Sequence, residues 1–182
     1  DMVSYTQATA GVVVGLKETH QQTVGAGFDT LISIEQVRGT GFNDWLAGTD
    51  GINELHGLNG NDIMFGRSQN DSLNGGNGDD ILDGGNGNDN LNGSFGTDAA
   101  SYLTALKGVT VDLAITGWQY TSSWSEWDKL INIENLIGSF FDDTLRGDDN
   151  DNVINAGAGN DVIEARGGDD TVVAGLGGGR DD

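Results

Sequence analysis

Aspartate recurs at intervals of nine residues in two stretches of the chain, and these carboxylates are the side chains best placed to do chemistry. The aspartates that share this spacing are Asp44, Asp62, Asp71, Asp80, Asp89 and Asp98, followed by Asp143, Asp161 and Asp170. Like charges in rows repel one another strongly unless cations lie between them. Calcium suits such rows because it takes many oxygen ligands from carboxylates and backbone carbonyls, whereas magnesium demands strict octahedral geometry. The sequence therefore predicts calcium sites along both stretches.

The aspartates belong to a nine-residue repeat that forms two arrays. Seven nonads fill residues 39–101, and five more fill residues 138–182, the last of them degenerate. Aspartate occupies the sixth position of the regular nonads, except where Asn53 and Asn152 replace it. The eighth position is apolar in every regular nonad. Two columns that stay in phase over this length indicate a repeat architecture.

Each nonad is predicted to fold as a turn followed by a very short strand. Positions one to six are rich in glycine, asparagine and aspartate, which tolerate tight or left-handed backbone. Positions seven to nine hold one apolar side chain between two more polar ones, as in a strand with alternating faces. Such a unit buries its apolar residue only when coils stack. We therefore expect an all-β solenoid with two nonads per coil, in which each nonad stacks on the nonad two along.

A longer repeat joins each array to a segment that precedes it. The motifs Asp-x-x-Ser-Tyr, Gly-Val-x-Val-x-Leu and Asp-x-Leu-Ile-x-Ile-Glu occur in this order before both arrays. In these motifs Glu35 and Glu134 fall at matching places, where we expect them to bond backbone amides. The phase of the repeat puts Asp1 at a sixth position, so the chain reads as a fragment of a longer array. The predicted organisation is a flanking or capping segment over 1–38, a roll over 39–101, a second flanking segment over 102–137 and a truncated roll over 138–182.

Composition argues against several functional classes. The net charge of −21 makes a nucleic-acid partner unsuitable, because phosphate binding needs clustered lysine and arginine. No apolar run is long enough for a transmembrane helix. The absence of cysteine excludes a disulfide framework and, with only two histidines, disfavours zinc. No nucleophile is paired with a base, so we expect no enzyme activity here, although a parent protein could carry a catalytic domain elsewhere.

Two adjacent nonads, 75–83 and 84–92, fit the pattern Gly-Gly-x-Gly-x-Asp-x-U-x, in which U is apolar. This is the nonapeptide of RTX proteins, a calcium-binding β-helix repeat. The flanking motifs resemble the segments that separate repeat blocks in large RTX toxins and adhesins, so the resemblance covers nearly the whole chain. It implies a right-handed parallel β-roll filled with calcium, exported by type I secretion machinery to the extracellular space or the bacterial cell surface. Low cytosolic calcium would keep the chain unfolded until export.

The resemblance also implies the calcium ligands. In the family, one nonad supplies to a site the carbonyls of its positions two and four and its position-six aspartate. The nonad two along supplies the carbonyls of its positions one and three and its own position-six aspartate. Carried over, the sites of the first array are Thr40, Phe42 and Asp44 with Gly57, Asn59 and Asp62; Leu58, Gly60 and Asp62 with Gly75, Asn77 and Asp80; Arg67, Gln69 and Asp71 with Gly84, Asn86 and Asp89; and Gly76, Gly78 and Asp80 with Gly93, Phe95 and Asp98. In the second array, Ser139, Phe141 and Asp143 join Ala156, Ala158 and Asp161. About eight calcium ions are implied in all.

Departures from the repeat predict weaker sites. Asn53 and Asn152 offer a neutral oxygen where the family prefers aspartate, so sites that use them are expected to be weak or empty. Arg67 and Gln69 stand where glycine is usual, which predicts strain in that turn. The last nonad has Gly179 at its sixth position, which leaves that site without its aspartate.

An aromatic segment precedes the second array and has no counterpart before the first. It contains Trp118, Tyr120, Trp124 and Trp127. Exposed aromatic side chains form platforms for sugars or for a partner protein, as in an adhesin that binds a glycan or a host cell surface. The alternative is a hairpin whose aromatic side chains cover the open end of the roll. The sequence leaves both interpretations open.

Overall fold

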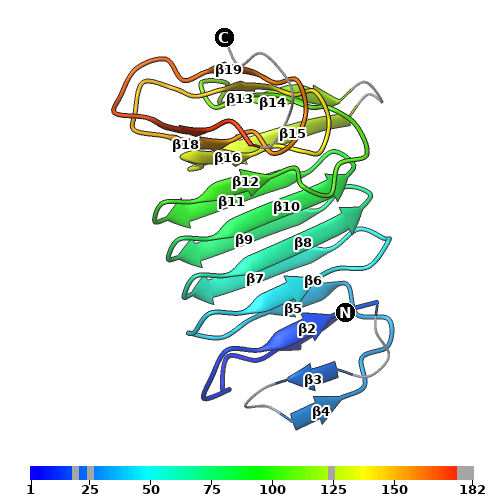
Figure 1. The fold of residues 1–182 in the computed structure, drawn as a ribbon. Helices are drawn as coiled ribbons and strands as arrows, with labels where there is room; N and C mark the ends of the chain where they lie inside the picture. The colour runs from blue at the N-terminus through cyan, green and yellow to red at the C-terminus, as the bar shows by residue number, and fades with distance from the viewer. Residues whose placement is uncertain (18–20, 24–26, 123–125, 176–182) are drawn as a thin grey trace.

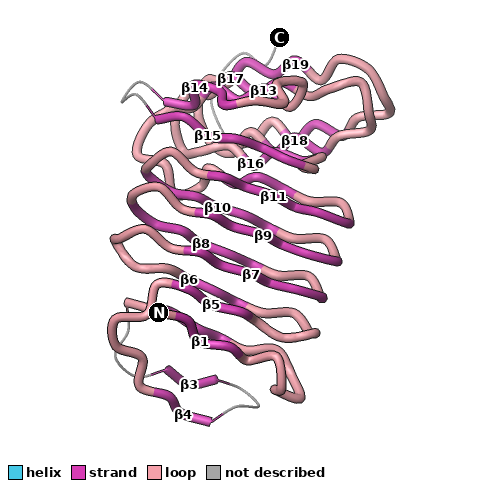
Figure 2. The backbone as a smooth tube through the Cα atoms, turned by 180° about the vertical axis from the view of Figure 1, so that it is seen from behind, coloured by secondary structure: helices cyan, strands magenta, loops and turns pink. Residues whose placement is uncertain are grey.

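The computed structural model describes residues 1–17, 21–23, 27–122 and 126–175, and every regular element within them is a strand. Figure 1 shows the strands stacked one above another from the N-terminal end to the second array. Turns join the strands along both edges of the stack (Figure 2). This is the all-β solenoid that the repeat predicts, and it has the parallel strands of the β-roll that the resemblance implies. In the described part of the chain, no helix is long and apolar enough to cross a membrane.

The strands form two long sheets, one short sheet and one isolated hairpin. The seven-stranded sheet consists, in spatial order, of β1 (Met2–Ser4), β5 (Gln36–Arg38), β7 (Glu54–Asn59), β9 (Ser72–Asn77), β11 (Asn90–Phe95), β15 (Glu126–Ile131) and β14 (Trp118–Ser122). The eight-stranded sheet consists of β2 (Val13–Gly15), β6 (Trp45–Ala47), β8 (Ile63–Ser68), β10 (Ile81–Asn86), β12 (Ala99–Ser101), β16 (Asn135–Ile137), β18 (Val153–Asn155) and β20 (Thr171–Val173). The short sheet is β13 (Thr110–Asp112), β17 (Thr144–Arg146) and β19 (Val162–Glu164), and the hairpin is β3 (Gln21–Thr23) and β4 (Gly27–Asp29).

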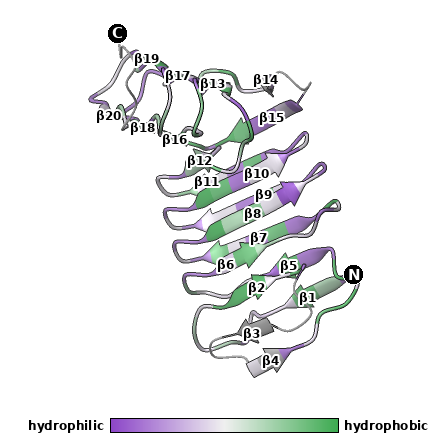
Figure 3. Cartoon of the chain, turned by 45° about the vertical axis from the view of Figure 1, so that its right-hand side comes forward, coloured by the Kyte–Doolittle hydropathy of each residue, from purple (hydrophilic) through white to green (hydrophobic). Residues whose placement is uncertain are grey.

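Successive nonads alternate between facing sheets, so each stacks on the nonad two along, as expected. Trp45 pairs with Ile63 in parallel register, and Ile63 pairs in turn with Ile81. Apart from Val172 in the last described strand, the eighth-position side chains belong to the core between the sheets. Those that are fully buried are Leu46, Leu55, Met64, Leu73, Leu82, Leu91, Ala100, Leu145 and Ile154. Figure 3 shows green, hydrophobic stretches in many of the stacked strands and purple, hydrophilic stretches along many of the turns and on parts of β9 and β15.

The segments that precede the arrays supply strands to the same sheets. Val37 of β5 pairs with Leu55, and Val14 of β2 pairs with Leu46, so both valines continue the buried eighth-position columns. Between the arrays, β12 pairs directly with β16, so the eight-stranded sheet runs through both of them. The seven-stranded sheet instead ends at the hairpin β14–β15, and in the second array β17 and β19 form the short sheet together with β13.

Several strands of the first array are twice as long as the repeat predicts. β7, β8, β9, β10 and β11 each contain six residues, which cover positions seven to nine and the first three positions of the next nonad. The reason is that turns of the same conformation stack in register, so Leu58 pairs with Gly76 and Asn59 with Asn77. The longer strands therefore mark where identical turns lie above one another.

Candidate metal centre

The sixth-position aspartates form rows that link the coils. One carboxylate oxygen, Oδ1, accepts a hydrogen bond from the backbone N–H of the sixth residue one coil earlier, with N···O distances of 2.7–2.9 Å. The aspartates bonded in this way are Asp62, Asp71, Asp80, Asp89, Asp98, Asp161 and Asp170. Each coil thus fixes the position of the carboxylate that belongs to the next coil.

The other oxygen of these carboxylates, Oδ2, is mostly left without a donor. It is buried and unpartnered in Asp62, Asp71, Asp80, Asp89, Asp98 and Asp161. Burial raises the carboxyl pKa to about 8 in Asp62 and Asp89, to about 7 in Asp71 and Asp80, and to about 6 in Asp98. A buried carboxylate with a free oxygen is unfavourable unless a positive charge satisfies it.

Glycine at the first position makes room for the unpartnered oxygen. A Cβ atom added at Gly57 would overlap Oδ2 of Asp62, and one added at Gly75 would overlap Oδ2 of Asp80. The same conflict arises between Gly84 and the carboxylate of Asp89. In these three turns, the glycine at the first position leaves space for the carboxylate of the aspartate five residues later.

Backbone carbonyls line the space between successive turns. The second and fourth residues of seven turns have positive φ, and we call these the open turns: 57–62, 66–71, 75–80, 84–89, 93–98, 156–161 and 165–170. A Cβ at Gly76 would overlap the carbonyl oxygen of Leu58 one coil below, so that oxygen points toward the next turn. Arg67 and Gln69 adopt φ of 86° and 68°, a conformation rare outside glycine, which confirms the strain expected there.

The arrangement fits a hard cation that takes carbonyl as well as carboxylate ligands. No three His, Cys, Asp or Glu side chains converge on one point in the described residues, so side chains alone do not form a metal cage there. Each open turn instead offers backbone carbonyls and, in most cases, one unpartnered carboxylate oxygen. Calcium accepts this all-oxygen mixture, whereas zinc prefers sulfur and nitrogen.

Two aspartates among the predicted ligands lie in a different environment. In Asp44, Oδ1 accepts hydrogen bonds from the Val12 N–H and the Thr40 hydroxyl, and Oδ2 accepts one from the Thr40 N–H. Asp143 makes the same bonds with Val109 and Ser139. We call the first two turns of each array the closed turns: 39–44, 48–53, 138–143 and 147–152. None of their residues has positive φ.

The structure brings the other predicted ligands together on neighbouring coils. The turn that contains Leu58, Gly60 and Asp62 stacks against the turn that begins at Gly75, and Asp62 N–H donates to Asp80 Oδ1 at 2.7 Å. The prediction for Glu134 is confirmed, since its Oε2 accepts a hydrogen bond from Asp98 N–H at 2.9 Å. The sixth position of the final nonad lies outside the described residues.

Sequence reasoning missed a second ladder at the fifth position. The side-chain oxygen of Asn43 accepts the Asn61 N–H, and Asn61 in turn accepts the Asp79 N–H, at 3.0 and 3.1 Å. Here the N–H of the later coil donates to the side chain of the earlier coil, opposite to the direction at the sixth position. Frequent asparagine and aspartate at position five was the available signal, but it also fits ordinary turn formation.

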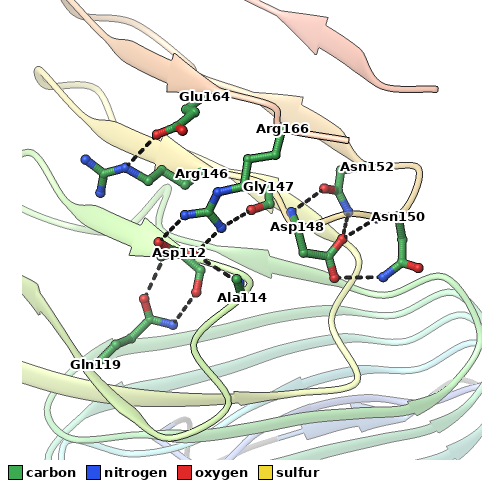
Figure 4. A network of polar contacts seen from close by, with 10 residues as sticks. All are labelled: Asp112, Ala114, Gln119, Arg146, Gly147, Asp148, Asn150, Asn152, Glu164 and Arg166. Atoms are coloured by element: carbon green, nitrogen blue, oxygen red, sulfur yellow. Dashed lines mark hydrogen bonds and ion pairs between the residues drawn. The ribbon is translucent and has the colours of Figure 1, made fainter. Parts of the chain in front are cut away.

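A long-range ion pair ties the second array to the segment before it. Both guanidinium NH groups of Arg166 bond the Asp112 carboxylate at 2.6 Å, and one also donates to the Gly147 carbonyl (Figure 4). The Arg166 guanidinium lowers the pKa of Asp112. No local pattern in the sequence indicates this pair.

The described aromatic side chains of the segment before the second array lie on the outer face of a hairpin. In the hairpin β14–β15, Gln119, Thr121 and Asp128 are buried, whereas Trp118, Tyr120 and Trp127 are 44–51% exposed. The hairpin of the second interpretation is present at the end of the seven-stranded sheet, and its described aromatic side chains are half-exposed. β15 pairs with β11, the last strand that the first array contributes to this sheet. Successive side chains alternate between the two faces of a strand, so the neighbours of the buried side chains face outward. Trp124 lies outside the described residues.

The stacked coils, the rows of buried carboxylates and the carbonyl-lined turns define a calcium-binding β-roll. Four copies of the RTX calcium-binding nonapeptide repeat match residues 38–73, 65–99, 132–163 and 146–181, which is more than half of the chain. The chain belongs to this family of RTX calcium-binding repeat proteins. A comparison with curated proteins finds no match.

Proposed function

We propose that this chain is a calcium-dependent folding module of a larger exported protein. The observation that supports this most strongly is the set of six buried Oδ2 atoms without a donor. A calcium ion between successive open turns would satisfy these oxygens and offset the repulsion along each row. RTX repeats are structural calcium-binding units rather than catalytic ones. Any enzyme activity of the parent protein is accordingly proposed to lie outside this chain.

The proposed ions lie between open turns of successive coils. One ion would take the carbonyls of Leu58 and Gly60 and a carboxylate oxygen of Asp62, completed by carbonyls and the aspartate of the turn at 75–80. Equivalent ions would lie between turns 66–71 and 84–89 and between turns 75–80 and 93–98. In the second array, Asp161 carries the unpartnered oxygen. The segments 1–38 and 102–137 are proposed to start the stacking of the arrays that follow them.

Calcium-dependent folding would suit export through type I secretion machinery, since the chain would stay unfolded in calcium-poor cytosol. A net charge of −21 and 31 glycines both favour the unfolded state when no cation is bound. RTX repeat proteins are typically secreted, and we propose an extracellular or bacterial cell-surface location. No cysteine is present that could form a disulfide before export.

The calcium requirement is tested by far-ultraviolet circular dichroism. With excess chelator at pH 8, we expect the spectrum of a disordered chain, and with millimolar calcium, the spectrum of a β-protein. Magnesium at the same concentration serves as the matched control and is expected to give little β-structure. A β spectrum that persists in chelator at this pH would contradict the proposal.

The outward aromatic face supports a second candidate function, recognition of a glycan. Trp118 and Trp127 line a groove of about 410 Å³ together with Asn70 and Asn88 of the roll. The Tyr120 ring lies edge-on to Trp127 at a centroid distance of 5.6 Å. Aromatic faces next to side-chain amides match the apolar C–H faces and the hydroxyl groups of a sugar.

A glycan array with the calcium-loaded chain tests this second candidate. Trp118→Ala and Trp127→Ala are each expected to weaken binding of any retained glycan by about tenfold or more, because stacking area is lost. Phe140→Ala removes an aromatic side chain that is 62% exposed outside the hairpin, and should leave binding unchanged. Retention of no glycan, or equal binding by the tryptophan variants, would contradict glycan recognition at this face.

A further inference from the structure

The four closed turns satisfy their sixth residue without any cation. Thr40 donates to Asp44 through its N–H at 2.7 Å and through its hydroxyl at 2.9 Å. Ser139 donates to Asp143 in the same two ways, at 2.6 and 2.7 Å. With the N–H of the preceding coil added, every carboxylate oxygen of both aspartates accepts a hydrogen bond. A calcium ion in such a turn would have to displace donors that are already in place.

The closed turns in which asparagine replaces the sixth-position aspartate form equivalent hydrogen bonds. Asn53 Oδ1 accepts the Thr49 N–H at 2.6 Å, and Asn152 Oδ1 accepts the Asp148 N–H at 2.8 Å (Figure 4). The amide groups of these asparagines also donate to a backbone carbonyl one coil below, at 3.2 and 2.8 Å. Charge at position six is therefore not needed to hold a closed turn.

The second residue fixes the shape of a closed turn. The hydroxyl of Thr40 accepts the Phe42 N–H at 3.0 Å, and the Ser139 hydroxyl accepts the Phe141 N–H at the same distance. The second residues of the other two closed turns are Thr49 and Asp148, and their side-chain oxygens likewise accept a hydrogen bond from the N–H two residues along. These local bonds hold positions two to four in a turn whose φ values stay negative, unlike the open turns.

Each pair of closed turns makes up one complete coil, and that coil lies at the start of its array. Its backbone N–H groups bond the carboxylates of the first open coil. Asp44 N–H donates to Asp62 and Asn53 N–H to Asp71, both at 2.7 Å. In the second array, Asp143 and Asn152 donate to the next coil in the same manner, at 2.9 Å. The closed coil thus positions the carboxylates of the first open turns, which are the first proposed calcium ligands of the array.

We propose that the closed turns bind no calcium and that each array begins with a metal-independent coil that positions the calcium-binding coils after it. This inference rests on the proposed function, since it takes the open turns to be the calcium sites. The sites implied for Thr40, Phe42 and Asp44 and for Ser139, Phe141 and Asp143 are then absent. The bound calcium falls below the eight ions that the repeat count implies.

The number of bound ions in aspartate variants tests this proposal. Equilibrium dialysis followed by metal analysis should give the same calcium content for wild type and for Asp44→Asn combined with Asp143→Asn, because asparagine already serves in the other two closed turns. Loss of one or more ions from this variant would overturn the proposal. Wild-type chain that binds no calcium would instead refute the proposed function, so the two failures are distinguishable.

A hydroxyl variant provides a second, independent test. Thr40→Val keeps the side-chain shape and removes the closing hydroxyl, so the calcium midpoint for folding should rise by about fivefold while the number of bound ions stays constant. If the turn instead bound calcium through the Thr40 carbonyl alone, loss of the hydroxyl would leave the calcium midpoint unchanged. An unchanged midpoint would therefore overturn the proposal. Thr97→Val, at an exposed fifth position, is the matched control and should leave the midpoint unchanged.

Discussion

Replacing Asp80 by asparagine is expected to remove about two calcium ions per chain and to raise the calcium midpoint for folding by about tenfold, equivalent to about 1.4 kcal/mol. Asp80 lies in the middle of the first array, and its Oδ2 is buried without a donor. In the proposed ligand sets it contributes to the ion below it and to the ion above it. Asparagine keeps the hydrogen bond from Asp62 N–H but offers no charge to either ion.

Asp79→Asn is the matched control for Asp80→Asn because it removes the same charge from the neighbouring residue. Asp79 is exposed, and its side-chain oxygen accepts the Thr97 N–H, a bond that asparagine preserves. Metal analysis and circular dichroism should therefore show nearly wild-type behaviour for Asp79→Asn. Equal effects of the two substitutions would mean that overall charge, rather than a ligand at position six, controls calcium binding.

The stacking of the coils could be predicted because each nonad repeats the same physical requirement. An apolar residue at position eight is buried only between facing sheets, so the period of nine fixes both the register and the core, as Leu55 and Leu73 show. The same reasoning placed Asp1 at a sixth position. Its carbonyl accepts the Gln36 N–H at 3.0 Å, which is the bond that Asp62 makes with Ile81.

The distinction between open and closed turns could not be predicted from the repeat. In the sequence, threonine or serine at position two is an ordinary turn residue. Only the structure shows that the hydroxyls of Thr40 and Ser139 donate hydrogen bonds to the aspartates of their own turns. Likewise, the pairing of β15 with β11 decides which face of the aromatic hairpin is exposed. Both features depend on which segment lies one coil away, and this tertiary information is absent from any single nonad.

Acid is expected to promote folding of the calcium-free chain. The folded chain holds the pKa of Asp62 and Asp89 at about 8 and of Asp71 and Asp80 at about 7, whereas the ordinary value is 3.8. A carboxyl whose pKa is higher in the folded state binds more protons when folded, so the free energy of unfolding falls as pH rises from about 4 to 8. Circular dichroism in chelator should accordingly show more β-structure at pH 5.5 than at pH 8.

Paired variants separate this local effect from general loss of negative charge. Asp62→Asn combined with Asp89→Asn removes two buried carboxylates, so the calcium-free variant should contain more β-structure at pH 8 and respond less to acid than wild type. Asp79→Asn combined with Asp151→Asn removes two charges at exposed fifth positions and should retain the wild-type pH dependence. Equal disorder of the wild-type chain at pH 5.5 and pH 8 would contradict the prediction. Because the buried carboxylates oppose folding without calcium and would bind it when present, the first pair should also raise the calcium concentration needed for full occupancy.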